Sequence, residues 1–379
     1  MITSTTSGVW ELDEVYAKRN AERWRPNNNG LFTWGRNDGQ LGHNDRASRS
    51  LPIQIPGTQW TKISGNLYTT FALKSDGTLW GIGQNLYGTL GQNNITYYSS
   101  PVQIPGTQWN IPRVGYTFAL ATKTDGTLWS WGYNAIYGTL GLNDKTHRSS
   151  PVQLPGTQWG SVSASYNISY ASKTDGTLWA WGYNTWGALG QNDIIYRSSP
   201  IQVPGTQWST TAFDGAGNAI YALKTDGTLW AWALNVAGQL GINDRNGRSS
   251  PVQVPGTSWN SVSAGYNSIF STKTDGTLWS WGSNNYGQLS QNNTTAYSSP
   301  TQIPGTQWVN DTLHGPSAYH VLVRKTDSTL WTWGIGNFGS LANNVSGANP
   351  YSSPIQIPGT AWTNPAVGYY FSGAIRPSY

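Results

Sequence analysis

Acid–base or metal chemistry needs carboxylates, histidines or cysteines at suitable spacing, and this chain offers few of them. It has no cysteine, and its three glutamates all lie within the first 22 residues. Ten of the 13 aspartates after residue 30 recur in two repeated motifs, which leaves Asp38, Asp214 and Asp311 in separate segments. The histidines at 43, 147, 314 and 320 lack metal-site spacing. The sequence therefore predicts no enzyme, no catalytic residue, no cofactor and no metal centre.

One of those two motifs pairs an acid with a base. Asp45, Asp144, Asp193 and Asp244 each stand four residues before an arginine, namely Arg49, Arg148, Arg197 and Arg248. In two other segments both members change together, giving Asn94 with Tyr98 and Asn293 with Tyr297. This joint change predicts a direct contact across a tight loop. Local pairing would neutralise these four arginines, so they would not form an open basic ring, and the net charge of +5 alone does not predict nucleic acid as a partner.

These pairs belong to a repeat of about 50 residues that covers residues 30–379. Pro-Gly-Thr-x-Trp occurs seven times, ending at Trp60, Trp109, Trp159, Trp208, Trp259, Trp308 and Trp362, at spacings of 49, 50, 49, 51, 49 and 54 residues. A second motif, Leu-x-x-Trp-Gly or a close variant, begins at positions 31, 79, 128, 178, 229, 278 and 330. The other aspartate motif, Thr-Asp-Gly or a variant, precedes six of these.

Each repeat has the pattern of short strands. Segments such as LWSW and VQI alternate apolar and outward residues, which is the period of a strand, and Asp-Gly is a hairpin turn. About four strands per repeat, arranged radially, make a propeller blade. The sequence therefore predicts an all-β, seven-bladed propeller. The tryptophans of both motifs are expected to pack within and between the blades, each contributing roughly 2–3 kcal/mol.

The two ends of the chain predict how the ring closes. The first repeat begins at Leu31 without the strand that precedes it elsewhere, and the C-terminal VGYYFSGAIRPSY aligns with that missing strand. One blade is therefore expected to combine strands from both ends, which leaves no unpaired sheet edge at the seam. We predict one propeller domain at 30–379 and a separate arm at 1–29.

The loops after each Leu-x-x-Trp-Gly motif vary freely on this frame. Loops held by a rigid frame often carry recognition, and equivalent loops crowd one rim of a propeller. Aromatic and amide side chains on a charge-poor surface suit glycan stacking or protein docking, and packing between blades is the alternative role. The candidate binding residues are Tyr87, Tyr97, Tyr137, His147, Trp186, Tyr196, Tyr286 and Phe338.

The combination of TDGTLW with LWSWGxNxxGxLG resembles the repeat of the regulator of chromosome condensation family, in its bacterial and viral style. The resemblance covers nearly all of residues 30–379 and implies a seven-bladed propeller. The best-known eukaryotic member promotes nucleotide exchange on a small GTPase and binds chromatin, and the exchange uses a wedge inserted in one blade. The only surplus in this sequence is four or five residues near 343–348, so the resemblance does not extend to exchange activity.

Residues 1–29 differ from the repeats. They hold eight of the 39 charged residues, with acids early and bases late, which suits the dipole of a short amphipathic helix that ends before Pro26. The segment GVWELDEVYAKRNAERW also resembles the leader of bacteriophage tail-fibre and virion proteins, notably those of cyanophages. That resemblance implies attachment to a particle. The candidate anchor residues are Val9, Trp10, Leu12, Val15, Tyr16 and Trp24.

Two functions remain open. The first is a non-enzymatic virion protein (tail fibre, appendage or capsid decoration) that is held to other virion proteins by residues 1–29. Its propeller would bind a host-surface glycan or protein, and it would assemble in the host cytoplasm. The second is a bacterial propeller that acts as a scaffold for another protein. The start of the sequence has no signal-peptide pattern, and no apolar stretch of 18 residues predicts a membrane span. The sequence leaves homo-oligomers open.

Overall fold

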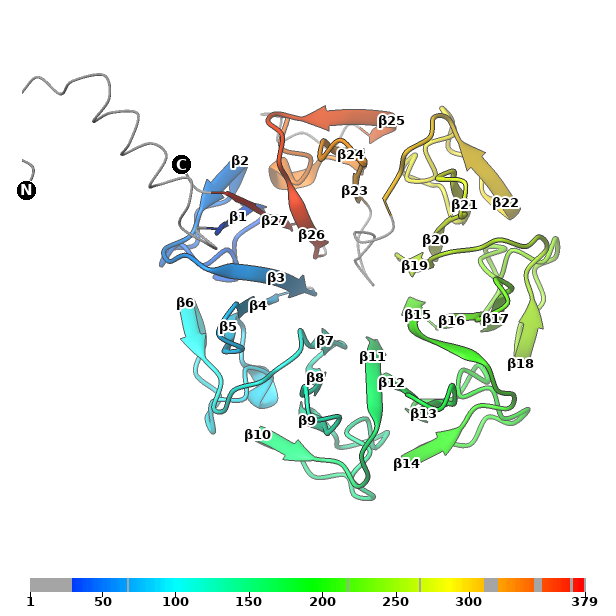
Figure 1. The fold of residues 1–379 in the computed structure, drawn as a ribbon, viewed down its shortest axis with the longest axis horizontal. Coiled ribbons are helices and arrows are strands. Elements are labelled where there is room, and N and C mark those ends of the chain that lie inside the picture. Colours follow the sequence, from blue (N-terminus) through cyan, green and yellow to red (C-terminus); the bar gives the residue numbers. More distant parts are fainter. Residues whose placement is uncertain are drawn as a thin grey trace, which may run out of the picture.

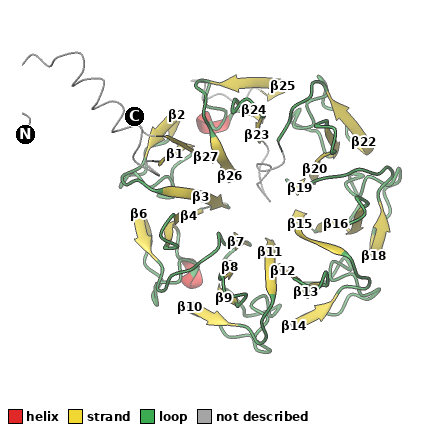
Figure 2. Ribbon diagram, in the orientation of Figure 1, coloured by secondary structure: helices red, strands yellow, loops and turns green. Residues whose placement is uncertain are grey.

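The computed structural model describes residues 29–66, 68–216, 218–265, 267–309, 320–343, 350–368 and 371–377. They form seven antiparallel sheets set like blades around a central axis (Figure 1). The predicted all-β, seven-bladed propeller is thus confirmed. Strands and loops make up the ring (Figure 2), and helix within the described residues is limited to two short 3₁₀ turns, η1 (Leu86–Gly88) and η2 (Asn337–Gly339).

Six of the seven blades run from a described inner strand beside the axis to an outer strand at the rim (Figure 1). Blade 1 contains β26 (Thr363–Val367), β27 (Phe371–Pro377), β1 (Asn29–Gly35) and β2 (Arg49–Gln54). Blade 2 contains β3 (Trp60–Gly65), β4 (Thr69–Lys74), β5 (Leu79–Gly83) and β6 (Tyr98–Gln103). Blade 3 contains β7 (Arg113–Val114), β8 (Phe118–Thr122), β9 (Leu128–Gly132) and β10 (Arg148–Gln153).

The remaining blades repeat this order. Blade 4 contains β11 (Trp159–Ser165), β12 (Ile168–Lys173), β13 (Leu178–Gly182) and β14 (Arg197–Gln202). Blade 5 contains β15 (Trp208–Ala216), β16 (Ala219–Lys224), β17 (Leu229–Ala233) and β18 (Arg248–Gln253). Blade 6 contains β19 (Ser263–Ala264), β20 (Ser268–Thr272), β21 (Leu278–Gly282) and β22 (Tyr297–Ile303). The described part of blade 7 contains β23 (His320–Arg324), β24 (Leu330–Ile335) and β25 (Pro350–Ile357).

The ring closes in blade 1 as the sequence predicts. Strand β1 pairs with β27 in an antiparallel ladder that runs from Asn29 opposite Pro377 to Gly35 opposite Phe371. Leu31 faces Ile375 within this ladder. Strands from opposite ends of the chain therefore share one sheet, and the seam has hydrogen-bonded neighbours on both sides.

The ring has two faces with different connections. We call the face with the Thr-Asp-Gly turns the turn face; there Gly77 adopts a φ of 77°, which glycine tolerates without a steric cost. Antiparallel strands place the long loops between third and outer strands on the opposite side, which we call the loop face. These loops are 36–48, 84–97, 133–147, 183–196, 234–247, 283–296 and their equivalent in blade 7. Because Asn29 pairs at the turn-face end, the chain enters the ring on the turn face.

Tryptophans join neighbouring blades, which confirms their predicted packing role. Trp281 is fully buried, and its Nε1–H donates to the backbone oxygen of Gln239 in the preceding blade at 2.8 Å. The same bond to the preceding blade, at 2.7–3.0 Å, is made by Trp34, Trp131, Trp181, Trp232 and Trp333. Ile82 occupies this position in blade 2, so the junction between blades 1 and 2 lacks the bond.

A lysine that sequence analysis did not single out secures each turn. In blade 4 the Lys173 Nζ lies 4.9 Å and 4.7 Å from the ring centroids of Trp159 and Trp179. The same sandwich occurs at Lys74, Lys123, Lys224, Lys273 and Lys325. In blade 1, Arg376 takes this role between Phe32 and Trp362. The cation attracts both ring faces and so fastens the Pro-Gly-Thr-x-Trp connection to the third strand.

Candidate functional site

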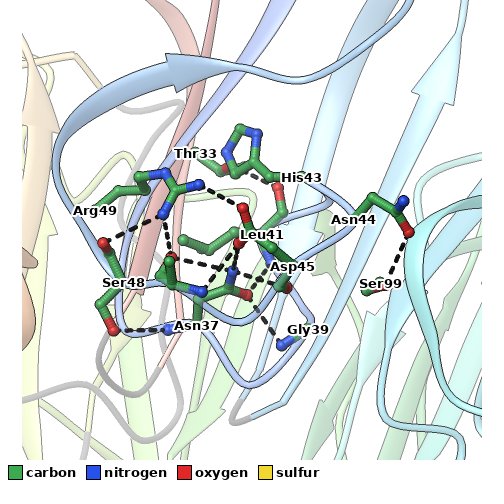
Figure 3. A network of polar contacts seen from close by, with 11 residues as sticks. Thr33, Asn37, Gly39, Leu41, His43, Asn44, Asp45, Ser48, Arg49 and Ser99 are labelled. Carbon is green, nitrogen blue, oxygen red and sulfur yellow. Dashed lines mark hydrogen bonds and ion pairs between the residues drawn. The ribbon is translucent and has the colours of Figure 1, made fainter.

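The loops of the loop face share a polar skeleton, drawn for blade 1 in Figure 3. The buried Asn37 donates its Nδ2–H to the Asp45 Oδ1 at 2.9 Å. The other carboxylate oxygen of Asp45 accepts from Arg49 Nη2 at 2.6 Å. Asn44 has a left-handed φ of 59°, and its backbone N–H donates to Ser99 in blade 2 at 2.9 Å. The repeated residues of the loop are thus used to hold the loop and to join it to the next blade.

The predicted acid–base pairs are all formed. The nitrogen–oxygen distances are 2.6 Å for Arg49, 2.5 Å for Arg148, 2.8 Å for Arg197 and 2.6 Å for Arg248. The backbone N–H of Asn246 and the Arg248 guanidinium hold the pKa of Asp244 below its usual value. The contact predicted where Asn and Tyr replace Asp and Arg is also confirmed.

In blade 2 the Asn94 Nδ2 donates to the Tyr98 hydroxyl at 3.1 Å, and in blade 6 the equivalent distance is 3.0 Å. The four arginines paired in blades 1, 3, 4 and 5 therefore serve their own loops and do not form an open basic ring.

All eight candidate binding residues lie in loop-face loops, although nothing in the structure tests whether they bind a ligand. Several of them pack between blades. Tyr87 of blade 2 meets Tyr133 and His147 of blade 3, with all three ring centroids 4.9 Å apart. His147 Nδ1 also accepts the backbone N–H of Asn134 at 3.0 Å. The structural role that the sequence left open for these rings therefore applies at this junction.

The next junction repeats this arrangement. Tyr137 of blade 3 lies 5.0 Å from Tyr183 and 5.4 Å from Tyr196 of blade 4, and burial raises the pKa of Tyr137. At the junction between blades 7 and 1, the Arg36 guanidinium lies 5.5 Å from the Phe338 ring and 2.8 Å from the Asp38 carboxylate. Trp186 and Tyr97 are 46 % exposed. Tyr286, in blade 6, is half-buried.

Exposed apolar side chains are unevenly spread over the ring. The described residues include 15 large apolar side chains that are exposed, and 11 of them lie in blades 2 to 4 on the loop face. We call these 11 the apolar arc: Leu86, Tyr87, Ile95, Tyr97, Tyr116, Ile136, Tyr166, Trp186, Ile194, Ile195 and Tyr196. The four isoleucines among them are 52–67 % exposed, which makes them the most exposed members.

Two tyrosines of the arc were missed by sequence analysis. Tyr116 and Tyr166 lie in the short loops between inner and second strands, beside the axis on the loop face. Their rings stack at 5.7 Å with an interplanar angle of 18°, and the Tyr116 backbone N–H donates to the Tyr166 oxygen at 2.8 Å. The signal in the sequence was a tyrosine at the same place in two successive repeats, after Gly115 and after Ser165.

A small pocket interrupts the arc between blades 2 and 3. It has a volume of about 60 Å³, and Leu86 and Tyr116 stand on its wall with Asn66, Thr69, Thr89 and Thr117. The Thr89 hydroxyl already donates to backbone oxygens of Leu86 and Thr117 at 2.7 Å and 2.9 Å. The pocket can therefore accept a small side chain without breaking a hydrogen bond of the ring.

The remaining acids and histidines have structural partners. Asp214 on inner strand β15 accepts from Ser163 Oγ of blade 4 at 3.0 Å and from the Ala264 N–H of blade 6 at 3.1 Å, and burial raises its pKa. His320 is buried against Ser372 Oγ at 2.8 Å, and burial lowers its pKa to about 3. Asp311 and His314 lie outside the described residues. In the described part, no group of three or more His, Asp or Glu could hold a metal ion.

A larger hollow, of about 960 Å³, opens on the turn face between blades 5 and 6. It forms beside an irregularity in β15. Trp208 and Phe213 of β15, which lie opposite Lys224 and Ala222 of β16, are five residues apart, whereas the equivalent Trp159 and Val162 of blade 4 are three residues apart. Hydroxyl side chains such as Thr211 and Ser261 line it, together with Arg113. No described helix is long and apolar enough to cross a membrane.

The chain was compared with known proteins. The model of the regulator of chromosome condensation (RCC1) repeat matches residues 28–73, 125–171, 175–215, 226–271 and 275–311, and a second model of the repeat matches 259–288. No curated protein matches the sequence.

Solved structures resemble it over nearly their whole length. Yeast RCC1 (Prp20), in its complex with Kap60, is 16 % identical with a TM-score of 0.80, covering 99 % of this chain and 94 % of that one. Prp20p of Saccharomyces cerevisiae, whose structure was reported with its binding properties to Gsp1p and histones, is 16 % identical with a TM-score of 0.81 and 94 % of each chain covered. Human WBSCR16 is 19 % identical with a TM-score of 0.78, covering 93 % of this chain and 99 % of that one. At these identities the likeness shows the fold alone.

Proposed function

Because this chain belongs to the regulator of chromosome condensation (RCC1) repeat family, we propose that it is a non-catalytic scaffold that binds another protein through its propeller. The family model covers more than half of the chain. Yeast Prp20, which shares the fold, is bound by Kap60 and has been studied for binding to Gsp1p and histones. These partners are proteins, and a protein partner is the part of their behaviour that we carry over to this chain.

The proposal rests on the presence of two kinds of residue in each loop of the loop face, repeated residues that hold the loop and variable residues between them. The repeated residues, such as Asn37, Asp45 and Arg49, bond to one another and fix the loop. The residues between them differ from blade to blade, and many are exposed. Such a frame holds a varied surface rigidly, which lowers the entropy lost on binding a partner. Proton transfer would need a matched acid and base, and the described acids are engaged in turns, ion pairs and strand contacts.

The virion hypothesis from the sequence has a narrower basis. Its anchor residues Val9, Trp10, Leu12, Val15, Tyr16 and Trp24 lie outside the described residues, and none of the proteins reported above is a bacteriophage protein. Attachment to a particle through residues 1–29 therefore stays a prediction. The topology adds one constraint to it. The chain enters the ring at Asn29 on the turn face, whereas the varied loops lie on the loop face.

Co-purification followed by reconstitution tests the proposed function. The full chain and a form lacking residues 1–28 are used as bait, and each captured protein is purified and titrated against both forms. A protein that binds the shortened form with unchanged affinity supports the scaffold proposal. A partner that binds only the full chain favours attachment by the arm. Faster nucleotide release from a small GTPase on adding the chain would contradict a pure scaffold.

A further inference from the structure

We propose that the apolar arc is the docking surface for an apolar face of the partner protein, with one small aliphatic side chain seated between Leu86 and Tyr116. This inference rests on the proposed function and specifies which part of the ring is used. It concerns a surface of blades 2 to 4 alone. The other four blades would serve to hold these three in place.

The repeat itself does not require these side chains. The residue after the loop acid or amide is Ile95 in blade 2 and Ile194 in blade 4, but Arg46, Arg245 and Thr294 in blades 1, 5 and 6. The fold forms equally well with either kind of residue at that position. Exposed isoleucines at 67 % and 64 % have no packing role in the ring. Concentration of exposed apolar side chains on one part of a folded protein is typical of an interaction site.

The side chains of the arc suit a protein better than a glycan. Sugars are recognised by flat aromatic faces beside hydrogen-bonding groups, and a branched aliphatic side chain offers neither. Several aromatic rings of the arc pack against other rings: Tyr87 packs against Tyr133 and His147, and Tyr116 stacks on Tyr166. The most exposed members are isoleucines. Burial of aliphatic surface is the main source of free energy in protein association, so a protein partner fits the arc better.

The loops of the arc carry little unpaired charge. The blade 2 loop from Gln92 to Tyr98 has no charged residue, and Arg148 and Arg197 are paired with aspartates of their own loops. Lys145 is exposed, and no ion pair to it is found among the described residues. The complementary partner surface is therefore apolar, with an acidic side chain placed to meet Lys145. A strongly charged partner would lose hydration against the arc without regaining it.

The pocket between blades 2 and 3 offers a place for one side chain of the partner. Its volume of about 60 Å³ suits a methyl or isopropyl group, and its wall joins Leu86 to Tyr116 within the arc. A small side chain that fills such a pocket buries apolar surface and excludes water from the interface. The occupant is accordingly a protein segment that presents a valine, alanine or similar side chain at this point.

Site-specific cross-linking tests the proposal, and the chain suits it because it has no cysteine. Single variants Ile95→Cys and Ile195→Cys carry a benzophenone label on the arc. Thr295→Cys carries the same label at the position in blade 6 that matches Ile195. We expect both arc labels to cross-link one and the same protein and the blade 6 label to give at most a tenth of that yield.

The captured protein is then purified, and its affinity is measured against substituted rings. We expect the triple variant Ile95→Ser, Ile194→Ser, Ile195→Ser to bind at least thirtyfold more weakly, since each truncated apolar contact costs severalfold. Val236→Ser is the matched control, because Val236 is 63 % exposed on the same face but lies in blade 5. All of these side chains are exposed, so the melting temperatures of the variants should match that of the parent chain.

Each other outcome counts against the arc. Equal cross-linking from blade 6, equal loss of affinity in the Val236 control, or capture of a glycan or of a second copy of this chain would overturn the proposal. A protein that binds the ring but is insensitive to the triple variant refutes the arc and leaves the scaffold function standing. If the ring binds no protein at all, the proposed function fails as well.

Discussion

The loop of blade 3 is held by an Asp–Arg pair, and the loop of blade 2 by an Asn–Tyr pair. Replacement of the first pair by the second within blade 3 tests how these contacts hold the loops. Asp144 Oδ2 accepts from Arg148 Nη2 at 2.5 Å, whereas in blade 2 the Asn94 Nδ2 donates to the Tyr98 hydroxyl at 3.1 Å. In both loops the Oδ1 atom accepts the side-chain amide of the buried asparagine, at 3.0 Å and 3.1 Å. The substitutions Asp144→Asn and Arg148→Tyr therefore change one side of the contact and leave the other intact.

The two single variants should differ in cost. Asp144→Asn places an amide donor against the guanidinium, so a hydrogen bond is lost and two donors meet, at a cost of about 1–1.5 kcal/mol. Arg148→Tyr keeps a hydroxyl that can donate to the carboxylate. It loses an ion pair whose side chains are 26 % and 36 % exposed, worth about 0.5 kcal/mol after screening by solvent. The double variant restores the amide–phenol pair and should lie within about 0.5 kcal/mol of the parent chain.

Urea unfolding followed by tryptophan fluorescence gives the four free energies of unfolding for a double-mutant cycle. We expect a coupling of about 1 kcal/mol between the two sites. Added salt should lower the free energy of unfolding of the parent chain more than that of the double variant, because only the parent chain has the ion pair at this position. If the double variant is as unstable as the sum of the two single variants, the contacts do not hold the loop, and our reading of the loop skeleton is wrong.

Three further predictions concern the ring itself. Burial lowers the pKa of His320 to about 3, so between pH 6.5 and pH 3 only the unfolded chain takes up a proton at this residue. As the pH falls through this range, the free energy of unfolding of the parent chain should decrease by up to about 1.4 kcal/mol per pH unit relative to that of His320→Gln. Parallel pH profiles of the two free energies would contradict this. Deletion of 371–379 should abolish cooperative thermal unfolding because β1 loses its partner, whereas deletion of 1–28 should shift the melting temperature by no more than a few degrees; a cooperative transition without 371–379 would refute closure by these strands. In urea unfolding, Trp281→Phe should lower the free energy of unfolding by about 2–3 kcal/mol, because it loses a hydrogen bond to the preceding blade and leaves a cavity. Trp279→Phe should lower it by under about 1 kcal/mol, because the Trp279 Nε1 bonds only to Thr277 within its own blade. Equal losses would count against the inter-blade role of Trp281.

Much of the fold could be predicted because seven copies of one pattern report on one structure. The missing strand before Leu31 and the surplus strand in the C-terminal tail fixed the seam without any coordinates. The joint change from Asp and Arg to Asn and Tyr worked in the same way, because each repeat acts as a variant of the others in a known context. Repetition thus identifies contacts inside a blade from sequence alone.

Exposure could not be predicted in this way, because it depends on which neighbours a side chain finds in the next blade. Tyr87 was expected at a binding rim; its ring is 37 % exposed there, but it also packs against His147 of blade 3. The sequence analysis chose aromatic residues as candidates and passed over Ile95 and Ile194, since an isoleucine in a strand-rich sequence is usually core. Their exposure follows from the paired residues beside them, which close the loop without covering the isoleucines.

Hydrogen–deuterium exchange of the ring with and without its captured partner is the most direct measurement of the central claim, that a rigid seven-bladed frame presents the apolar arc to a protein. We predict slower exchange on binding in 84–97, 134–147 and 184–196, and unchanged exchange in 285–296 and in the Thr-Asp-Gly turns. Protection confined to the turn face, or spread equally over all seven blades, would contradict the account.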